Sequence, residues 1–466
     1  MKKFTKLSLG VLATFVATTS FASEITVWED NNKSVGLSTA AKDFEKQFGC
    51  TVNLVERDAG AHLNDVIGMM EKKEQTPDVF IIISDKVGEA VTKNIISPTS
   101  LMKSDADKYA DVAVSVFNYN HEIYAFPRSI ESLVVYYNKD ELAYPFETFS
   151  EYEKHAQSLK GTGKYGLIGK IDNFYFGYGL MAGFGAYIFG INSDGTFNPN
   201  DIGLNNEGTV QGLGLISKYA NEFMPEKILT DDGWGLIDDM FKKGEAAAVI
   251  NGPWALDGYA KSGVNYGVAP LPKLSNGKSI RPFYGVKGYA ICSNSKNKEL
   301  AEKFLEFANQ EQYAIYRYSQ IAEFPPVKEV MSNPLITNDD YANAISTQIL
   351  NADPMPSIPQ MGYVWGAMGD AMTKVIKEKA DPKKSLDGAV KAIQDSIKAE
   401  TAPKVVEEEK VIEDTEAQAN ASDENATEQE NAESTPTTEV ENSTEATEDN
   451  TNAIEQETVT DETDAK

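Results

Sequence analysis

The sequence is poor in the residues that build disulfide and metal sites. Its 466 residues include two cysteines, Cys50 and Cys292, and three histidines. Two cysteines are too few for a disulfide framework, and three scattered histidines offer no metal-ligand spacing. We therefore expect no metal site and no cofactor. Two buried thiols are favoured over a disulfide, although an exported protein could form either.

Basic residues are also scarce, since 43 lysines and arginines face 71 aspartates and glutamates, for a net charge of -28. This balance argues against a nucleic-acid partner, because phosphate binding needs basic patches. The acidic excess is concentrated in residues 405–466, where 21 acidic residues accompany only Lys410 and Lys466. A segment this polar cannot bury enough apolar area to order itself, so 403–466 is predicted to be a disordered tail. The tail is either a solvated spacer or a binder of cations or a partner.

Long apolar runs are absent except near the N-terminus. Three lysines lie among the first six residues, an apolar run covers 7–16, and small residues follow at Ser20 and Ala22. This order predicts a signal peptide over 1–22 that is cleaved before Ser23. The run is too short to remain as a membrane span, and no cysteine stands at the cleavage point to carry a lipid. We expect a soluble, exported, periplasmic protein.

The remaining chain, with 41% hydrophobic residues, alternates predicted strands and helices. A strand over 25–28 precedes a helix that Ser34 caps, with Leu37, Ala41, Phe44 and Phe48 at helical spacing before Gly49. Strands follow over 51–55 and 78–83, the second apolar enough for burial on both faces. This order predicts a doubly wound α/β layer. Polar residues follow two of its strand ends, where open α/β sheets bind ligands.

The middle of the chain repeats the pattern less regularly. Strands are predicted over 122–126 and 133–137, joined by a connection over 127–132. Ser150 and Glu153 form a predicted capping box for a helix through Leu159. The segment from Asp172 to Phe189 is rich in aromatics and glycine, which fits a tight packing corner as well as a ligand surface. Later elements are predicted as strands over 265–269 and 289–293 and helices over 297–309 and 385–399.

One stretch, Lys243 to Leu256, combines a helix end, a strand and a new helix. Gly244 ends a helix, Ala246–Ile250 is a short buried strand, and Asn251-Gly252 turns the chain. Pro253 suits the first position of the next helix. Trp254 therefore lies just beyond the carboxyl end of a strand, either as a stacking surface for a ligand or as a core side chain.

The pattern Lys-Gly-Glu-Ala-Ala-(x)3-Asn-Gly-Pro-Trp in this stretch resembles the maltose/maltodextrin-binding proteins, the solute-binding subunits of ABC sugar importers. Weaker matches in the same order, such as Ala-Phe-Pro at 125–127 and Pro-Gln-Met at 359–361, extend the resemblance over 24–399. It implies two doubly wound α/β lobes joined by hinge crossovers, the type II fold of periplasmic binding proteins. The expected N-terminal lobe comprises 23–130 and 286–335, and the C-terminal lobe 131–285 and 336–402.

The resemblance also implies a set of ligand-binding residues, and their chemistry suits a sugar. Charged side chains bond hydroxyls strongly, and aromatic rings pack on the C–H faces of a pyranose. The implied residues are Lys33, Asp85, Glu131, Tyr175, Trp254, Met355 and Trp365, with Asn32, Lys86 and Asn173 at positions where the family has other polar residues. Without the resemblance, Lys33, Asp85 and Glu131 would be read as solvated surface charges.

The sequence departs from the family pattern in ways that bear on the ligand. Ile82 replaces a tryptophan, and Gly366 and Gly369 replace polar or aromatic residues near Trp365. Asn32 and Asn173 replace acidic residues, with Asp30 and Asp172 as candidate substitutes. The aromatic surface is therefore mostly kept, while the hydroxyl-binding residues change. These changes argue against maltose as the ligand more than they argue against an oligosaccharide.

The implied function is periplasmic binding of maltose/maltodextrin-type oligosaccharides and their delivery to the permease subunits of an inner-membrane ABC transporter. A different oligosaccharide or a small sugar is the nearest alternative. A secreted glycosidase is the alternative of another class, because Asp85 and Glu131 could serve as its two carboxylates. We expect a monomeric binding protein and not an enzyme.

Overall fold

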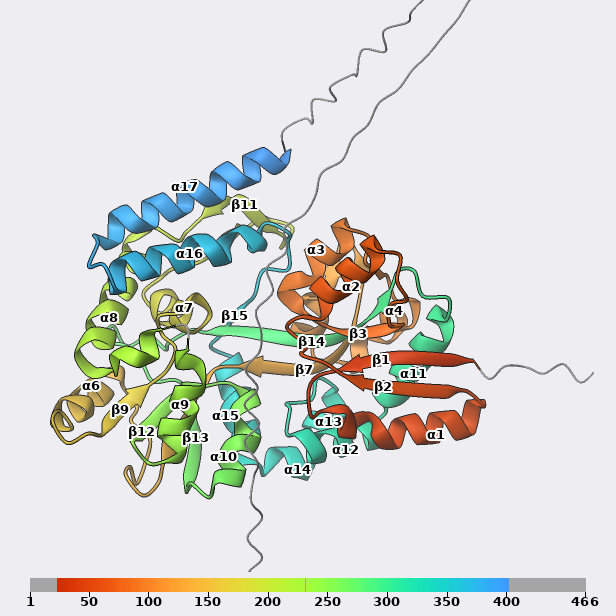
Figure 1. Ribbon diagram of the computed structural model, residues 1–466, viewed down its shortest axis with the longest axis horizontal. Helices are drawn as coiled ribbons and strands as arrows, with labels where there is room; N and C mark the ends of the chain where they lie inside the picture. The colour runs from red at the N-terminus through yellow and green to blue at the C-terminus, as the bar shows by residue number, and fades with distance from the viewer. Residues whose placement is uncertain (1–22, 231, 402–466) are drawn as a thin grey trace, which may run out of the picture. The chain divides into compact units, whose positions relative to one another are not determined.

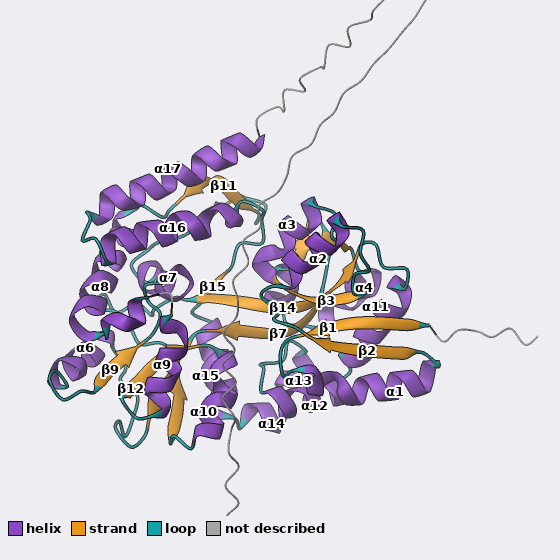
Figure 2. Ribbon diagram, viewed as in Figure 1, coloured by secondary structure: helices purple, strands orange, loops and turns teal. Residues whose placement is uncertain are grey.

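The computed structural model describes residues 23–230 and 232–401, which fold around two main β-sheets with helices packed on them (Figures 1 and 2). The predicted signal peptide over 1–22 and the predicted tail over 403–466 lie outside the described residues. The mixed helix and strand content agrees with the predicted α/β class. No helix within the described ranges is long and apolar enough to cross a membrane.

The first sheet has seven strands: five follow the order β15-β14-β3-β1-β2, and β4 and β7 also pair with β14. Its strands are β1 (Glu24–Glu29), β2 (Thr51–Glu56), β3 (Val79–Ile83), β4 (Ile96–Ser97), β7 (Phe126–Ser132), β14 (Phe283–Cys292) and β15 (Asp353–Pro354). Strand β1 runs parallel to β2 and β3, whereas β14 runs antiparallel to β3 and β7. The carboxyl ends of β1 and β3 therefore meet at one edge, next to the middle of β14.

The second sheet has four strands in the order β13-β8-β12-β9. They are β8 (Val134–Asn138), β9 (Tyr165–Ile168), β12 (Ala246–Asn251) and β13 (Tyr266–Ala269). Strand β12 is buried along its whole length, parallel to β9 and antiparallel to β8. Two small hairpins, β5 (Asn118–Tyr119) with β6 (Glu122–Ile123) and β10 (Phe189–Ile191) with β11 (Phe197–Ile202), lie outside both main sheets.

Helices connect and cover these strands. The longer ones are α1 (Ser38–Phe48), α2 (His62–Glu71), α6 (Phe149–Ser158), α7 (Phe174–Ala182), α8 (Glu207–Phe223), α9 (Gly233–Lys242), α11 (Lys298–Ala308), α12 (Glu311–Ile321), α15 (Asp340–Ile349), α16 (Met361–Ile376) and α17 (Pro382–Thr401). The shorter ones are α3 (Val87–Thr92), α4 (Ser100–Asp105), α5 (Asp111–Ser115), α10 (Leu256–Ser262), α13 (Lys328–Met331) and α14 (Pro334–Thr337). Short 3-10 turns are η1 (Ser34–Leu37), η2 (Ser84–Lys86), η3 (Ala106–Lys108), η4 (Glu226–Leu229) and η5 (Pro253–Ala255).

The chain passes from the first sheet to the second through a single residue, Leu133, which separates β7 from β8. It returns at β14, which is buried along all ten residues and lies beside β7 (Figure 1). A third connection runs through β15, which pairs with the start of β14. These three connections between the sheets place residues from both sheets next to β14.

Several predictions about local structure are wrong. The predicted connection over 127–132 is strand β7, because its polar residues are buried and pair with β14. The predicted strand over 122–126 is a two-residue strand, β6, followed by the start of β7. Strand β14 begins six residues before the predicted 289.

Two predicted helix caps also lie elsewhere. Ser34 caps nothing with its side chain; its N–H donates to Glu56 Oε1, and α1 begins at Ser38. The capping box of α6 uses Thr148 and Glu151 and not the overlapping Ser150 and Glu153, which lets the ring of Phe149 reach the core.

Other predictions are confirmed. Cys50 and Cys292 are free and buried thiols. Helix α9 ends before Gly244, β12 covers the predicted 246–250, and Pro253 takes the first turn of η5. Helix α17 covers the predicted 385–399, and its apolar stripe, including Leu386 and Ile393, is buried.

Candidate functional site

The turn after β12 presents Trp254 to solvent. Asn251 is 1% exposed and fixes the turn: its Nδ2 donates to Asp238 and to the Tyr259 hydroxyl, and its Oδ1 accepts from Gly252 N–H at 2.9 Å. The Tyr136 hydroxyl donates to Gly252 O from the neighbouring strand β8. Trp254 itself is 42% exposed, so the interpretation as a core tryptophan is wrong. The sequence Asn-Gly-Pro therefore builds a rigid base for an exposed indole.

Gly252 is required because the indole of Trp254 folds back over it. A Cβ at position 252 would lie 2.2 Å from the Trp254 ring. From the other side, the ring of Tyr175 on α7 lies 6.3 Å from that of Trp254, and Phe176 lies at the same distance. Tyr175 also contacts Phe283 of β14, whose ring lies 6.1 Å from that of Trp365. The three predicted aromatic residues thus form one connected surface.

Asp85 connects the first sheet to this surface. It lies in η2 at the carboxyl end of β3, and its carboxylate accepts a hydrogen bond from the side chain of Trp365 on α16. Lys86 Nζ lies 3.8 Å from Asp85 Oδ2. Burial raises the pKa of Asp85 to about 6, although Lys86 and Trp365 oppose the shift. A carboxylate held in this environment is an acceptor that gains from any further hydroxyl donor.

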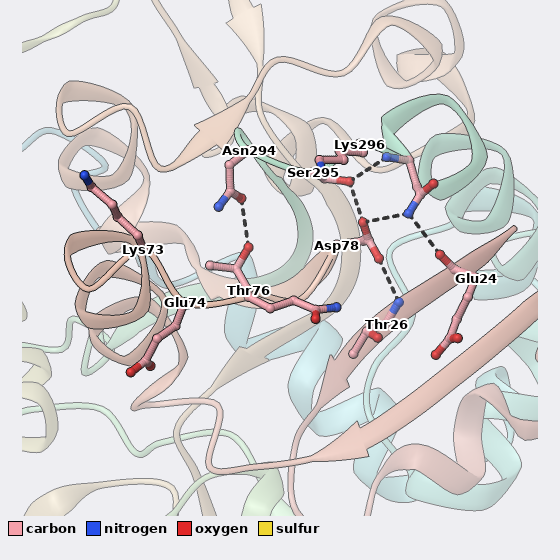
Figure 3. Close-up of a pocket in the computed structure, with 11 residues that line it drawn as sticks. Glu24, Thr26, Lys73, Glu74, Thr76, Asp78, Asn294, Ser295 and Lys296 are labelled. Atoms are coloured by element: carbon pink, nitrogen blue, oxygen red, sulfur yellow. Dashed lines mark hydrogen bonds between the residues drawn. The ribbon is translucent and has the colours of Figure 1, made fainter.

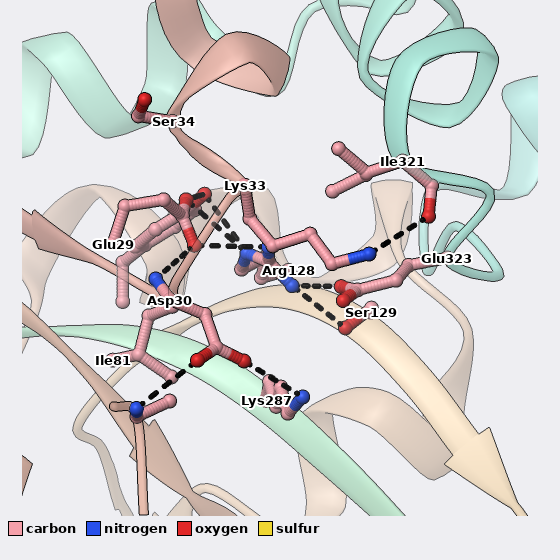
Figure 4. A network of polar contacts seen from close by, with 12 residues as sticks. Glu29, Asp30, Lys33, Ser34, Ile81, Arg128, Ser129, Lys287, Ile321 and Glu323 are labelled. Carbon is pink, nitrogen blue, oxygen red and sulfur yellow. Dashed lines mark hydrogen bonds and ion pairs between the residues drawn. The ribbon is translucent and has the colours of Figure 1, made fainter. Parts of the chain in front are cut away.

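Glu131 pairs with Lys287, which belongs to the network of charges shown in Figure 4. Lys287 Nζ on β14 lies 3.4 Å from Glu131 Oε2 and 3.4 Å from Asp30 Oδ2. Lys33 Nζ donates to Ile321 O at 3.4 Å, and burial together with Arg128 and Lys287 lowers its pKa. Asp30, which follows β1, and Glu131 of β7 therefore both face Lys287.

Arg128 forms the base of this cluster. Its side chain is inaccessible to solvent and pairs with Glu29 at 2.9 Å and with Glu323, while its Nε donates to the Tyr289 hydroxyl at 3.1 Å. Burial alone would lower the pKa of Arg128, but Glu29 and Tyr289 raise it above its ordinary value. Removing one partner of a buried pair leaves an uncompensated charge, so this network fixes the ends of β1 and β7.

Three buried polar atoms near Glu131 have no hydrogen-bond partner within residues 23–230 and 232–401. They are Glu131 Oε2, Tyr175 Oη and Tyr341 Oη. Burial and the charge of Glu131 raise the pKa of Tyr175, and burial, the neighbouring Tyr136 and Glu131 raise that of Tyr341. Because buried polar groups are normally paired, these atoms indicate where a polar ligand would bond.

The other predicted residues are placed differently. Met355 is 3% exposed, and its Cε, like the Glu131 side chain, packs against Gly285. Asn173 caps α7, and its Oδ1 accepts from Tyr175 N–H at 3.0 Å. Asn32 is exposed in the left-handed region at φ 61°, away from the lysine cluster that Asp30 faces. The substitute Asp30 is therefore better placed than Asn32, and Ile82 is buried within β3.

Sequence reasoning missed three residues beside this region. Trp234 on α9 is 46% exposed, and its ring lies 5.6 Å from Phe176. Lys287 and Tyr341 are buried on β14 and α15. Trp234 stands in the apolar pattern of its helix, and Lys287 stands between glycines, so only their three-dimensional neighbours distinguish them.

A polar cavity of about 650 Å³ lies at the opposite, amino-terminal ends of β1 and β3 (Figure 3). Its acidic centre, Asp78, accepts from Ser295 Oγ at 2.6 Å, Asn297 Nδ2 at 3.3 Å and Thr26 N–H at 2.9 Å. The cavity contains none of the predicted site residues. Its polar side chains hydrogen-bond one another. Open α/β sheets bind ligands at the carboxyl ends of their strands, so the cavity lies at the end opposite to the expected ligand site.

The family model for bacterial extracellular solute-binding proteins matches residues 39–344. The chain belongs to this family. The solute-binding protein is 35% identical over 390 residues to a galactooligosaccharide-binding protein of Bacillus subtilis (strain 168), covering 83% of this chain and 92% of the relative. It is 33% identical over 386 residues to a maltooligosaccharide ABC transporter solute-binding lipoprotein of Streptococcus pneumoniae, covering 81% and 90%.

Solved structures agree with this assignment. A cyclo/maltodextrin-binding protein complexed with maltotetraose matches with a TM-score of 0.72 at 33% identity, over 82% of this chain and 98% of that one. MalX from Streptococcus pneumoniae, in complex with maltopentaose, matches with a TM-score of 0.74 at 32% identity, over 80% and 100%. The predicted periplasmic-binding-protein fold is confirmed. Membership of an extracellular family also indicates that the solute-binding protein is exported.

Proposed function

We propose that this solute-binding protein binds a neutral oligosaccharide of the maltodextrin type and delivers it to an ABC importer of the inner membrane. The aromatic surface of Tyr175, Trp254 and Trp365 suits the C–H faces of successive sugar rings. The carboxylates Asp85 and Glu131 suit the hydroxyls at their edges. Trp234 extends the aromatic surface for a longer oligomer.

The observation that carries this proposal is the position of the unpartnered buried polar atoms. Tyr175 Oη and Glu131 Oε2 have no hydrogen-bond partner in the described part of the chain, although Lys287 forms an ion pair with Glu131, and the ring of Tyr175 lies beside the exposed Trp254. A sugar supplies a hydrogen-bond partner for the buried polar atoms, because its hydroxyls both donate and accept, and a packing partner for the exposed indole, because its ring faces pack on aromatics. A purely apolar ligand would leave these atoms unpaired, at a cost of about 1–3 kcal/mol each.

We further propose that the two sheets are the cores of two lobes that close on the ligand. The lobes comprise 23–130 with 286–335, and 131–285 with 336–402. Asp85 and Lys33 then come from one lobe and Trp254 and Trp365 from the other. A ligand that touches both sets has more contacts in the closed form, so its binding energy favours closure. The mature protein is a periplasmic monomer that begins at Ser23.

A galactooligosaccharide is the second candidate ligand. The relative from Bacillus subtilis carries that name at 35% identity, slightly above the 33% of the maltooligosaccharide-binding lipoprotein. Of the altered positions, Asn32 and Asn173 replace acidic residues, Ile82 replaces a tryptophan, and Gly366 and Gly369 replace polar or aromatic residues. Tyr175, Trp254 and Trp365 are kept, so a change of sugar with most of the stacking retained fits that distribution.

The experiment is a thermal-shift screen of the mature protein against maltose, maltotetraose, cyclodextrin, β-1,4-linked galactotetraose and cellotetraose. Ligand binding raises the apparent melting temperature, so the sugar that fits raises it most. We expect an increase with maltotetraose or galactotetraose. No increase with any of these sugars would contradict the proposal.

The same samples test the glycosidase alternative. A glycosidase needs its two carboxylates free to act as acid and base or nucleophile. The Asp85 carboxylate is hydrogen-bonded to the Trp365 side chain, and Glu131 forms an ion pair with Lys287. Because neither carboxylate is free, we expect the protein to bind the sugar without hydrolysing it. Release of shorter sugars during prolonged incubation with the purified protein would support an enzyme.

A further inference from the structure

Lys287 is a buried cation that serves two carboxylates at once. Its side chain is 9% exposed, and its ammonium lies 3.4 Å from Asp30 Oδ2 and 3.4 Å from Glu131 Oε2. Asp30 follows β1, Glu131 lies in β7, and Lys287 lies in the strand between, opposite Ile83 and Ser129. The ammonium thus joins the ends of two strands that the backbone does not pair directly.

The ammonium retains donor capacity. A lysine ammonium carries three N–H donors, and the contacts described for Lys287 within 23–230 and 232–401 are these two carboxylate oxygens, both at long distance. On the other side of the pair, Glu131 Oε2 has no hydrogen bond in the described residues. A buried cation and a buried carboxylate that are both incompletely bonded mark a place that a polar ligand can complete.

The arrangement also explains how Asp30 remains charged although it is partly buried. Asp30 Oδ1 accepts from Ala59 N–H at 3.2 Å and from Asn31 N–H at 2.9 Å, which leaves Oδ2 facing Lys287. Burial alone would raise the pKa of Asp30, but Lys287 and these backbone donors lower it. Without the ammonium, Asp30 would lose its main cationic partner, and its pKa would rise.

We propose that Lys287 is a positioning residue of the sugar site that holds Asp30 and Glu131 together as a pair of hydroxyl acceptors. The inference rests on the proposed function and deepens it. In this arrangement Asp30 takes the acceptor role that position 32 cannot fill, since Asn32 is exposed and turned into the left-handed region. The ligand class is a neutral sugar with two hydroxyls close enough to reach both carboxylates.

Other charged or titratable groups face the pair from every neighbouring element. They are Glu29 and Lys33 at the end of β1, His62 on α2, Asp85 in η2, Arg128 on β7 with its partner Glu323, Tyr175 on α7 and Tyr341 on α15. The pKa of His62 is lowered mainly by its own burial, and Lys287 is not among the causes of that shift. A difference between the two proteins therefore isolates the effect of Lys287.

The test compares the wild type with Lys287→Met and Lys287→Arg, using calorimetric titration with maltotetraose and β-1,4-linked galactotetraose between about pH 5 and pH 8. Because Asp85, with a pKa of about 6, titrates in this range in every variant, the readout is the affinity of each variant relative to the wild type at the same pH. Lys287→Met should bind about tenfold to hundredfold more weakly at neutral pH, the usual cost of a lost charged hydrogen bond. Its affinity should fall further toward acidic pH, and Lys287→Arg should recover part of the loss. Lys303→Met, an exposed lysine on α11, is the matched control and should match the wild type.

A second readout is independent of the sugar. A carbon-13 NMR titration of labelled aspartate carboxyls should show that the pKa of Asp30 rises in Lys287→Met and returns toward the wild-type value in Lys287→Arg. If Lys287→Met does not fold, Lys287→Gln replaces it.

Unchanged affinity in the Met variant would overturn the inference, and so would an equal loss at every pH with an unchanged Asp30 pKa. Failure of the wild type to bind either sugar would instead refute the proposed function and the sugar role of Lys287 with it. The Asp30 titration would still decide whether Lys287 keeps that carboxylate charged.

Discussion

At the scale of single residues, Asp85 opposes stability while serving the site. Its side chain is 7% exposed, and burial is the main reason that its pKa is raised to about 6. A carboxyl whose folded-state pKa exceeds its unfolded value of 3.8 favours folding below that value, and this contribution is lost as the pH rises through about 6. Function and stability therefore place opposite demands on this residue.

We predict that Asp85→Asn raises the free energy of unfolding at neutral pH by about 1–3 kcal/mol, because it removes a buried charge and keeps an oxygen that can accept from Trp365. The same change should weaken sugar binding. Thermal melts across the pH range provide the measurement: the advantage of the variant should be large above about pH 6 and vanish below about pH 4. A variant that is less stable than the wild type at neutral pH would contradict this account.

At the scale of elements, the turn between β12 and η5 depends on one glycine. A Cβ at position 252 would collide with the Trp254 ring, so the indole must leave its place over the turn. We predict that Gly252→Ala lowers sugar affinity at least about tenfold, since a displaced aromatic anchor no longer packs on the ligand. Calorimetric titration measures this loss.

Gly214→Ala is the matched control for that variant. Gly214 lies inside α8, and nothing is within 4 Å of the position that its Cβ would take. We expect unchanged affinity and a gain of about 0.5–1 kcal/mol in stability. If both alanine variants bind sugar equally well, Trp254 does not depend on Gly252 for its function.

Another element, β3, is held by a buried histidine. His62 Nδ1 accepts from Ile81 N–H at 3.1 Å, which requires the neutral ring with its proton on Nε2, 3.2 Å from Arg57 O. Burial is the main cause that lowers the pKa of His62, despite opposing hydrogen bonds and carboxylates. A histidine with a lowered folded-state pKa supports stability at neutral pH and loses that contribution as the pH falls through the folded value.

We predict that the wild type loses on the order of 1 kcal/mol of stability from His62 as the pH falls from about 7 to about 5. Denaturant unfolding at a series of pH values measures the loss, which should shrink in His62→Gln. His121→Asn, a change at an exposed histidine, should leave the pH dependence as it is. An identical pH dependence in wild type and His62→Gln would exclude this role of His62.

The elements that sequence alone predicted are those fixed by local signals. Gly244, Asn251 and Pro253 act on their immediate neighbours, so the helix end, the turn and the next helix start were predictable. The two capping boxes near α6 overlap in sequence, and only the burial of Phe149 decides between Thr148 and Ser150.

Strands β7 and β14 were missed or shortened for a different reason. Their charged residues Arg128, Glu131 and Lys287 resemble those of an exposed loop. They are buried because partners distant in the chain compensate their charges. The same long-range dependence hid Lys287 and Tyr341 from the candidate site, whereas the resemblance to a family supplied Asp85, Tyr175, Trp254 and Trp365.

At the scale of the whole molecule, all the candidate site residues lie between Asp30 and Trp365, so the acidic segment 405–466 is predicted to be dispensable for binding. Removing it should leave sugar affinity within about twofold, because it takes away no residue of the site. Calorimetry on the truncated mature protein tests this. A larger loss would show that the segment contributes to binding or to closure.

The central claim is that an oligosaccharide packs on the aromatic surface around Trp254 and bridges the two sheets. The most direct test is the affinity of Trp254→Ala for the sugar that binds the wild type, measured by calorimetric titration alongside thermal melts. We predict a loss of about 1–3 kcal/mol in binding with little change in melting temperature, because the indole is 42% exposed. Trp28→Ala, at a 3% exposed tryptophan, should instead lower the melting temperature. Unchanged sugar affinity in Trp254→Ala would contradict the account.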